Sequence, residues 1–466
     1  MLVKRFVLRL TLAGFLELNG FVGRQRNTSL PPTSMTTAKK HSSSEIEPTC
    51  IGSGKFIHTF DLKSEALTVR LAPEKDYCAV GQCDGCLLLL PTPNMRKKCV
   101  RLELQADEGL PCTDLAFIPR RSELRRLISV YASGFIRIWQ FTETGKGSLW
   151  KTWRETEVKP DGEGDDDGVT KYNQILCLGV SPDSKRFVTG GSDTIVRVYD
   201  ILRRSAGRLL IPSIRTDNTV AQNSHTNRVT SLVYHPRGAK DAALAHIFFS
   251  ASWDGTVQGW DDRTCGSLWQ YAGTSVAGSD GLCVDSTRNL LISGSFKHDK
   301  VLSQVWQARM FGASENRNTM VNMDKPLSTI LQDANSPPVQ IYVVRPSPDN
   351  EFLVFGGTNC NMIKLIQSAT MRQLALVTNL PVGVYSADIC VDAADKKRFL
   401  VSFTNGKKVY LLLQLALVTN LPVGVYSADI CVDAADKKRF LVSFTNGKKV
   451  YLLLVDPRHP NFSETP

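Results

Sequence analysis

The sequence predicts an all-β fold built from repeated antiparallel sheets. The first observation is a hairpin pattern at residues 246–263, HIFFSASWDGTVQGWDDR, in which two strand-like runs flank Asp254-Gly255. Asp-Gly between such runs is a strong hairpin signal, because both turn positions must tolerate positive φ. The second observation is that similar runs recur along the chain. The third is the length of 466 residues, which is typical of a ring of about seven such repeats.

Four side chains in and near this hairpin can form one buried hydrogen-bond network. The Trp260 indole N–H needs an acceptor when it is buried, and Ser250, Asp254 and the upstream His225 can complete a chain that ends on the turn backbone. These residues resemble a repeat of the WD-repeat family, in which the matching His, Ser, Asp and Trp form a structural tetrad within one blade of a β-propeller. A catalytic Ser/His/Asp set is the alternative. The resemblance argues against it, since Ser250 would lie within a strand and not on a strained turn.

The resemblance covers about residues 51–456 and implies a WD-repeat β-propeller of four-stranded blades. We expect residues 1–50 to form a leader or disordered tail and residues 457–466 to form a C-terminal tail. Residues 1–34 are too short in their apolar part to span a bilayer. Three interpretations stay open for them: the true start is Met35, the segment is a targeting sequence, or it is an unrelated tail.

Six blades follow from strand–turn–strand patterns along the chain. Their segments are residues 66–90, 112–141, 175–200, 225–261, 281–307 and 339–367. Only the fourth carries the full tetrad. The Trp position holds Leu90, Trp139, Tyr199, Trp306 and Leu365 in the first, second, third, fifth and sixth. In the third blade Lys171 falls where the resemblance places the His, next to Thr189 and Asp193 at the Ser and Asp positions.

Two long polar stretches interrupt these segments. Residues 154–171 are strongly acidic, but Gln174 stands where a calcium-binding loop needs a bidentate Glu, so we expect a solvated loop. Residues 308–338 are mostly polar, and loops of this length are usually binding or disordered segments.

The seventh blade is predicted within a duplicated segment. Residues 373–413 recur without a change at 414–454, and the unit of 41 residues is close to one blade in length. It spans an expected outer strand of blade six and three strands of blade seven. One copy gives seven blades and two give eight. Identical copies indicate either a very recent duplication or an error in the sequence, and we favour the error.

The ring needs one more strand to close. Pro457 and Pro460 prevent the C-terminal tail from continuing as a strand, so the last blade lacks its outer strand. Residues 56–60, FIHTF, are a spare strand near the N-terminus. Propellers of the family close by pairing an N-terminal strand with the C-terminal blade, which removes exposed edges. We therefore expect Phe56–Phe60 to complete the last blade.

Motifs and charge favour a non-enzymatic protein with no cofactor and no catalytic, cofactor-binding or metal-ligating residues. GSGKF at 52–56 lacks the remaining residues of a phosphate loop, and Cys83 and Cys86 lack a second pair of zinc ligands. The twelve scattered cysteines are typical of free thiols in a reducing compartment. The net charge of +11 comes partly from residues 1–34 and the duplicated segment. We therefore expect neither a nucleic-acid nor a membrane partner.

The resemblance implies a scaffold that binds partner proteins or peptides on the propeller faces. The residue before the turn Asp faces the top surface in the family, which makes Trp253 a candidate binding anchor; the alternative is that it packs against the neighbouring blade. The alternative function comes from Trp260-Asp261-Asp262-Arg263. It resembles the WDxR motif of substrate receptors of cullin–RING ubiquitin ligases, in which the Arg, here Arg263, contacts the ligase adaptor. Gly259 departs from the aliphatic residue expected before this Trp. We expect a cytoplasmic location, with the nucleus, or mitochondria if residues 1–34 are a targeting sequence, as the alternatives.

Overall fold

The computed structural model describes most of residues 48–414 and, beyond them, residues 443–446 and 449–451. The gaps within 48–414 are residues 53–59, 93–97, 103–109, 120–123, 144, 158–169, 204–207, 211–224, 265–266, 298, 309–320, 324, 333–336, 381, 392–398 and 407. The candidate calcium loop falls mostly in one of these gaps. Apart from one short 3₁₀ helix, η1 (Pro236–Ala239), the regular elements of the described residues are strands. In this part of the chain no helix is both long enough and apolar enough to cross a membrane.

Four blades follow one another in the first part of the chain, each with its innermost strand first. Blade one contains β3 (Ala66–Leu71), β4 (Tyr77–Gln82), β5 (Leu87–Pro91) and β6 (Val100–Leu102). Blade two contains β7 (Cys112–Ile118), β8 (Arg125–Tyr131), β9 (Phe135–Phe141) and β10 (Gly147–Arg154). Blade three contains β11 (Ile175–Val180), β12 (Arg186–Gly191), β13 (Val196–Asp200) and β14 (Arg208–Leu210). Blade four contains β15 (Val229–Tyr234), β16 (Ile247–Ser252), β17 (Thr256–Asp261) and β18 (Trp269–Ala272).

Three further blades complete the set. Blade five contains β19 (Leu282–Asp285), β20 (Leu290–Gly294), β21 (Val301–Gln307) and β23 (Ser328–Leu331). Blade six contains β24 (Gln340–Pro346), β25 (Phe352–Thr358), β26 (Met362–Gln367) and β27 (Gln373–Thr378). Blade seven contains β28 (Ala387–Val391), β29 (Phe399–Asn405), β30 (Lys408–Gln414) and, as its outer strand, β2 (Phe60–Asp61). Within each blade neighbouring strands pair antiparallel.

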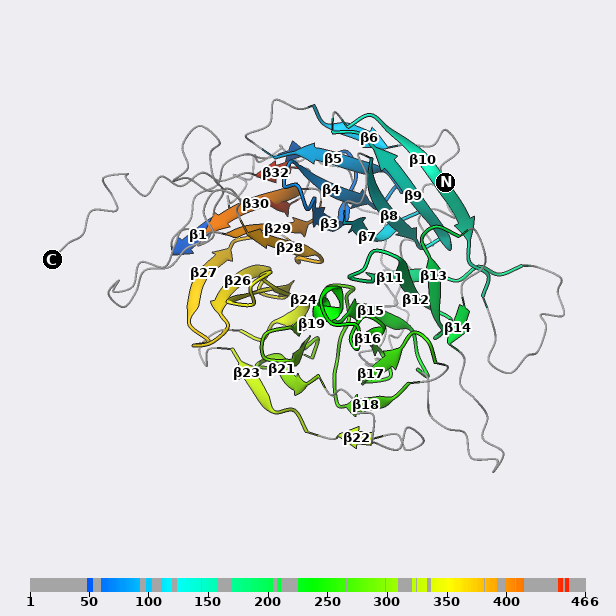
Figure 1. The fold of residues 1–466 in the computed structure, drawn as a ribbon. Helices are drawn as coiled ribbons and strands as arrows, with labels where there is room; N and C mark the ends of the chain where they lie inside the picture. The colour runs from blue at the N-terminus through cyan, green and yellow to red at the C-terminus, as the bar shows by residue number, and fades with distance from the viewer. Residues whose placement is uncertain are drawn as a thin grey trace, which may run out of the picture. The chain divides into compact units, whose positions relative to one another are not determined.

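The innermost strands contact one another in chain order and close into a ring. The sequence of contacts is β3, β7, β11, β15, β19, β24 and β28, and β28 returns to β3 (Figure 1). The fold is therefore an all-β propeller of seven four-stranded blades, as the sequence predicts.

The N-terminal closing strand is confirmed. Phe60 and Asp61 of β2 pair antiparallel with Val409 and Lys408 of β30, so blade seven is completed from the N-terminal side. Residues 56–59 of the predicted strand lie outside the described residues. A further strand, β1 (Thr49–Gly52), pairs antiparallel with β27 at the edge of blade six. The boundary expected between residues 50 and 51 thus falls within a strand.

The first copy of the duplicated segment supplies the strands that the sequence assigns to it. Its β27 is the outer strand of blade six, and β28–β30 are three strands of blade seven. Of the second copy the structure describes β31 (Ser443–Asn446) and β32 (Lys449–Tyr451), which join the sheet of blade seven. The described residues therefore contain seven blades and no eighth sheet.

The loop predicted at 308–338 contains two strands, so that expectation is wrong in part. β23 is the outer strand of blade five, and β22 (Val321–Met323) pairs parallel with β18 of blade four. Both strands are only a few residues long and lie within a mostly polar segment. They pair because the edge of an existing sheet is available, and their own hydrophobicity does not predict them.

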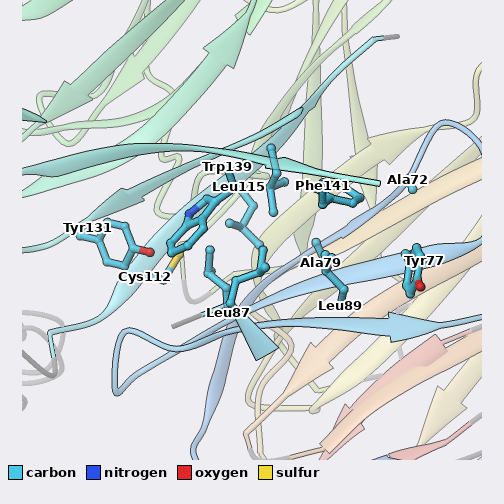
Figure 2. Packing of buried hydrophobic residues seen from close by; sticks show 12 residues of the cluster. Ala72, Tyr77, Ala79, Leu87, Leu89, Cys112, Leu115, Tyr131, Trp139 and Phe141 are labelled. Atoms are coloured by element: carbon cyan, nitrogen blue, oxygen red, sulfur yellow. The ribbon is translucent and has the colours of Figure 1, made fainter. Parts of the chain in front are cut away.

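Adjacent blades pack through apolar side chains that alternate along the strands. Between blades one and two, Trp139 and Phe141 of β9 pack with Leu87 and Leu89 of β5 in one buried cluster (Figure 2). Full burial of such a side chain contributes about 1.5–3 kcal/mol. This packing holds each sheet rigidly and so fixes the turns at its ends.

Candidate functional site

The structure brings His225, Ser250, Asp254 and Trp260 together in one hydrogen-bonded chain. The Trp260 indole Nε1–H donates to Ser250 Oγ at 2.7 Å. Ser250 Oγ lies 2.6 Å from His225 Nε2, and His225 Nδ1 lies 2.9 Å from Asp254 Oδ2. Since Ser250 is fully buried and its hydroxyl is occupied by the indole and the imidazole, this arrangement positions a turn and offers no accessible nucleophile.

Asp254 is held as a carboxylate by its surroundings. Burial by itself would raise the pKa of its carboxyl, but hydrogen bonds with His225 and Thr256 and the Thr226 amide lower that pKa to about 2. Its Oδ1 accepts from the backbone N–H of Thr256 at 2.8 Å, and its Oδ2 accepts from that of Thr226 at 3.0 Å. The carboxylate therefore joins the loop that enters β15 to the turn that follows β16.

Only one position of that turn uses the left-handed conformation. Gly255 has a φ of +82°, whereas Asp254 is not among the residues with positive φ. The loop consists of Trp253, Asp254 and Gly255, and three-residue hairpin loops need the left-handed conformation only at their last position.

Trp253 lies on the face of the ring that carries these turns and the loops into the inner strands, which we call the top face. Its side chain is half-buried, and the Arg228 guanidinium carbon lies 4.8 Å from its ring centroid. The Trp253 backbone N–H donates to the Arg228 carbonyl oxygen at 3.2 Å. The indole is thus held in place by a cation and by the tetrad turn.

A second group of aromatic rings and arginines lies on the top face at blades two and three. The Arg154 guanidinium carbon lies 3.5 Å from the ring centroid of Tyr172 and 4.8 Å from that of Phe135. The Arg137 guanidinium carbon lies 5.0 Å from the Phe135 ring centroid and 4.7 Å from that of Tyr131. Tyr172 is 39% exposed at the end of this stack. The sequence did not indicate this group of stacked side chains, because the acidic loop separates Tyr172 from Arg154 along the chain.

In blade three a residue other than the expected one takes the place of the tetrad His. Lys171 is exposed, and Glu155, which directly follows β10, occupies the position. Its Oε1 accepts from the Thr189 hydroxyl at 2.6 Å and from the Tyr199 hydroxyl at 2.9 Å. Its Oε2 lies 3.5 Å from Arg197, which also forms an ion pair with Asp193 at 2.5 Å.

Glu155 works as an acceptor in this place although it is buried. Burial raises the pKa of its carboxyl above the ordinary value, and Arg197 and the hydrogen bonds of Thr189, Asn173 and Tyr199 oppose that rise. A carboxylate that accepts several bonds beside a buried guanidinium is compensated. Blade three is therefore held by an acid and an arginine instead of by a His.

Blades two and five contain the Trp–Ser half of the network. The Trp139 indole donates to Ser129 Oγ at 3.0 Å, and the Trp306 indole donates to Ser293 Oγ at 3.2 Å. Each of these bonds ties the third strand of a blade to its second.

Arg263 lies on the opposite, bottom face, after the end of β17. Its Nε and Nη2 donate to the two carboxylate oxygens of Asp261 at 2.9 and 2.7 Å, while 55% of its side chain stays exposed. This pairing lowers the pKa of the Asp261 carboxyl against the effect of its burial. Gly259 is explained by packing, because a Cβ there would lie 2.4 Å from the Trp269 ring.

Among the described residues, one group of three side chains could offer ligands to a metal ion: His246, Asp261 and Asp262. Asp262 Oδ1 lies 2.6 Å from His246 Nδ1, its Oδ2 accepts from Tyr234 Oη at 2.9 Å, and the same oxygen lies 2.9 Å from Arg186 Nε in an ion pair. These donors and Arg263 already neutralise the two carboxylates.

The Cys86 thiol of the CxxC pair accepts from Arg101 Nε at 2.9 Å. The expectation that the chain needs no metal or cofactor stays a prediction.

The largest polar cluster that the sequence reasoning missed lies at the centre of the ring. Arg70 Nη2 donates to Asp114 Oδ1 and to Asp280 Oδ1, each at 2.7 Å. Arg70 Nη1 donates to Asp280 Oδ2 at 3.0 Å and to Ser386 Oγ at 3.1 Å. Arg345 Nη2 lies 2.8 Å from Asp280 Oδ1. Blades one, two, five, six and seven meet in these contacts, which we call the axial cluster.

Comparison with known proteins finds similarities in parts of the chain and in the fold. The model of the WD domain, G-beta repeat, matches residues 169–200 and 218–261, the segments of blades three and four. The β-propeller domain of Cps50 (Swd1) from Myceliophteria thermophila has the same fold: the TM-score is 0.54, the identity 12%, and the match covers 78% of this chain and all of that one. The chain therefore has the β-propeller fold, and two of its blades match the WD-repeat model.

Two curated relatives match shorter stretches. Periodic tryptophan protein 2 of Arabidopsis thaliana is 25% identical over 138 residues, which are 30% of this chain and 13% of that protein. Pre-mRNA-processing factor 19 of Bos taurus is 29% identical over 160 residues, 31% of this chain and 27% of that protein. The match thus spans less than a third of the length of either relative.

Proposed function

We propose that the chain is a non-enzymatic scaffold that binds partner proteins or peptides on the top face of blades two to four. The observation that carries this proposal is Trp253, which the tetrad turn and Arg228 hold at this face. Binding hot spots are enriched in Trp, Tyr and Arg, and a side chain that is already fixed loses little entropy on binding. Tyr172 on Arg154 adds a second such anchor on the neighbouring blade.

The experiment is affinity capture with the full chain followed by mass spectrometry. We compare wild type, Trp253→Ala and Tyr172→Ala with Leu202→Ala, a matched control at an apolar side chain that is 69% exposed after β13, on the bottom face. We expect partners that wild type and the control recover equally and that both top-face variants lose by at least about tenfold. Equal recovery by all four proteins would refute the choice of the top face.

The second candidate function is that of a substrate receptor of a cullin–RING ubiquitin ligase. It is favoured by the WDxR sequence and by the exposed position of Arg263, whose guanidinium Asp261 orients on the bottom face. We compare Arg263→Ala with Arg237→Ala, an exposed arginine of the same blade. Recovery of a cullin adaptor by wild type and Arg237→Ala, but not by Arg263→Ala, would establish this function. Absence of the adaptor from all three would leave the scaffold alone.

We also propose a cytoplasmic location. The sequence has twelve cysteines, and those whose side chains the structure describes are free thiols, which suits a reducing compartment. Imaging of the full chain and of a variant without residues 1–34, each with a C-terminal fluorescent tag, tests this. Mitochondrial signal from the full chain alone would instead assign residues 1–34 to targeting.

A further inference from the structure

The axial cluster shares its positive charge unequally between two buried carboxylates. Asp280 faces both guanidiniums, and it also accepts from the Ser386 hydroxyl at 2.6 Å and from the Ala387 N–H at 3.2 Å. Among the described residues, Asp114 forms an ion pair with Arg70 alone, although Arg345 also lowers its pKa, and it otherwise accepts from the Leu115 and Leu178 N–H groups. Since Arg70 Nη2 donates to both carboxylates, they are close neighbours of like charge.

The charges of the cluster do not balance when every carboxyl is ionised. Its cations are Arg70 and Arg345, and its acids are Asp114, Asp280 and the partly exposed Asp388, whose Oδ2 accepts from the Leu71 N–H at 2.9 Å. Among the described residues, three buried thiols also interact electrostatically with members of the cluster: Cys112, Cys177 and Cys283. Burial raises the pKa of each of these thiols, so they are neutral. Among these described groups, the carboxylates therefore exceed the cations by one charge.

We propose that the axial cluster is a proton-linked clamp, in which Asp114 takes up one proton between neutral and mildly acidic pH and thereby changes the contact between blades two and three. Asp114 is the site because it holds the smaller share of the positive charge. The proton adds to Oδ2, since Oδ1 accepts from Arg70 at 2.7 Å and from the Leu115 N–H at 2.8 Å.

The structural consequence follows from the partner of Oδ2. This oxygen accepts from the Leu178 N–H of β11 at 3.1 Å, the direct bond from Asp114 to blade three. A protonated Oδ2 is a neutral hydroxyl oxygen and a much weaker acceptor, so this bond weakens while the Arg70 pair on Oδ1 remains. The clamp thus loosens at β11 and keeps blades one and two together.

The energetic sign is set by the pKa of Asp114. Burial raises the pKa of this carboxyl, Arg70 lowers it, and the neighbouring Asp280 raises it further. The resulting pKa is about 6, against an ordinary value of 3.8. Asp280 behaves oppositely: burial would raise its pKa, but Arg345 and Arg70 lower it. A raised pKa in the folded state means that the stability linked to Asp114 is present below about pH 4 and is lost as pH rises to about 6. The unfolding constant should increase by about 100-fold over this interval from this group alone.

The test compares wild type with Asp114→Asn in the full chain, with urea unfolding measured from pH 4 to pH 8. We expect the ratio of their unfolding constants to change by about 100-fold between pH 4 and pH 7. Asp388→Asn serves as the control within the same cluster and should keep the wild-type pH profile. Parallel profiles of wild type and Asp114→Asn would overturn the proposal.

A second measurement needs no variant and covers the case in which Asp114→Asn fails to fold. Amide hydrogen exchange of wild type, corrected for the intrinsic rate, is compared at pH 5 and pH 7.5. Protection of Leu178 should fall several-fold at pH 5 relative to that of Ala387, which is bonded to Asp280. Equal behaviour of the two amides would overturn the proposal as well.

Discussion

Ser250→Ala removes the shared acceptor of the blade-four tetrad. Ser250 is fully buried, and its hydroxyl is the partner of the Trp260 indole at 2.7 Å and of His225 Nε2 at 2.6 Å. Each lost bond contributes about 0.5–1.5 kcal/mol, and the buried indole N–H left without an acceptor costs about 1–3 kcal/mol. We expect Ser250→Ala to lower the free energy of unfolding by about 2–4 kcal/mol, although the change removes a single oxygen atom.

A double-mutant cycle with Trp260→Phe separates the bond from the loss of packing. Phe removes the indole N–H, so Ser250→Ala should cost less in the Trp260→Phe background, with a coupling of about 1–2 kcal/mol. Urea unfolding followed by far-ultraviolet circular dichroism gives the four free energies and does not depend on the tryptophan that is mutated. Additive effects, or a cost of Ser250→Ala under about 0.5 kcal/mol, would refute the network argument.

Three further predictions test other parts of the ring. Glu155→Gln replaces the acceptor beside Arg197 by a neutral amide and should cost about 2–4 kcal/mol in urea unfolding, whereas Lys171→Ala should cost under about 1 kcal/mol; the reverse order would restore Lys171 as the tetrad substitute. The pKa of Asp254, lowered to about 2, stabilises the fold by about 2 kcal/mol above pH 4, and this stability should disappear as pH falls towards 2. A constant difference between wild type and Asp254→Asn over that range would contradict it. Deletion of residues 51–62 removes β2 and should abolish the cooperative thermal transition, whereas deletion of residues 1–34 should leave the Tm unchanged; equal melting of the two truncations would exclude closure by the N-terminal strand.

The features that the sequence predicted correctly are those with a short-range or a counting signal. The Asp254-Gly255 hairpin is local, and its strands are β16 and β17. The closing strand followed from counting: the last blade lacked a strand, and FIHTF ending at Phe60 was spare. Both arguments needed no knowledge of which distant side chains meet.

The features that were missed depend on contacts across long stretches of chain. Arg70 and Asp280 are 210 residues apart, and Arg70 within ALTVRL has the pattern of an ordinary strand residue. Only the ring brings opposite inner strands together, so no local pattern could indicate the pair. Glu155 was missed for a similar reason, because a long acidic loop separates it from β11. Lys171 was chosen instead because it stands at the spacing before β11 where the resemblance places the His.

The two kinds of polar network are distributed unevenly around the ring, and this predicts where it opens first. Blades one and six carry Leu at the Trp position, yet these blades supply the guanidiniums of the axial cluster, Arg70 and Arg345. Blade four has the full tetrad and contributes no charge to that cluster. Removal of one partner from a buried ion pair costs about 3–5 kcal/mol, so Arg70→Met should destabilise the ring by about this amount. Hydrogen exchange should then increase first in β3 and β28, on either side of the lost guanidinium, and last in β15–β17. Uniform acceleration in all blades would show instead that the ring unfolds as one cooperative unit.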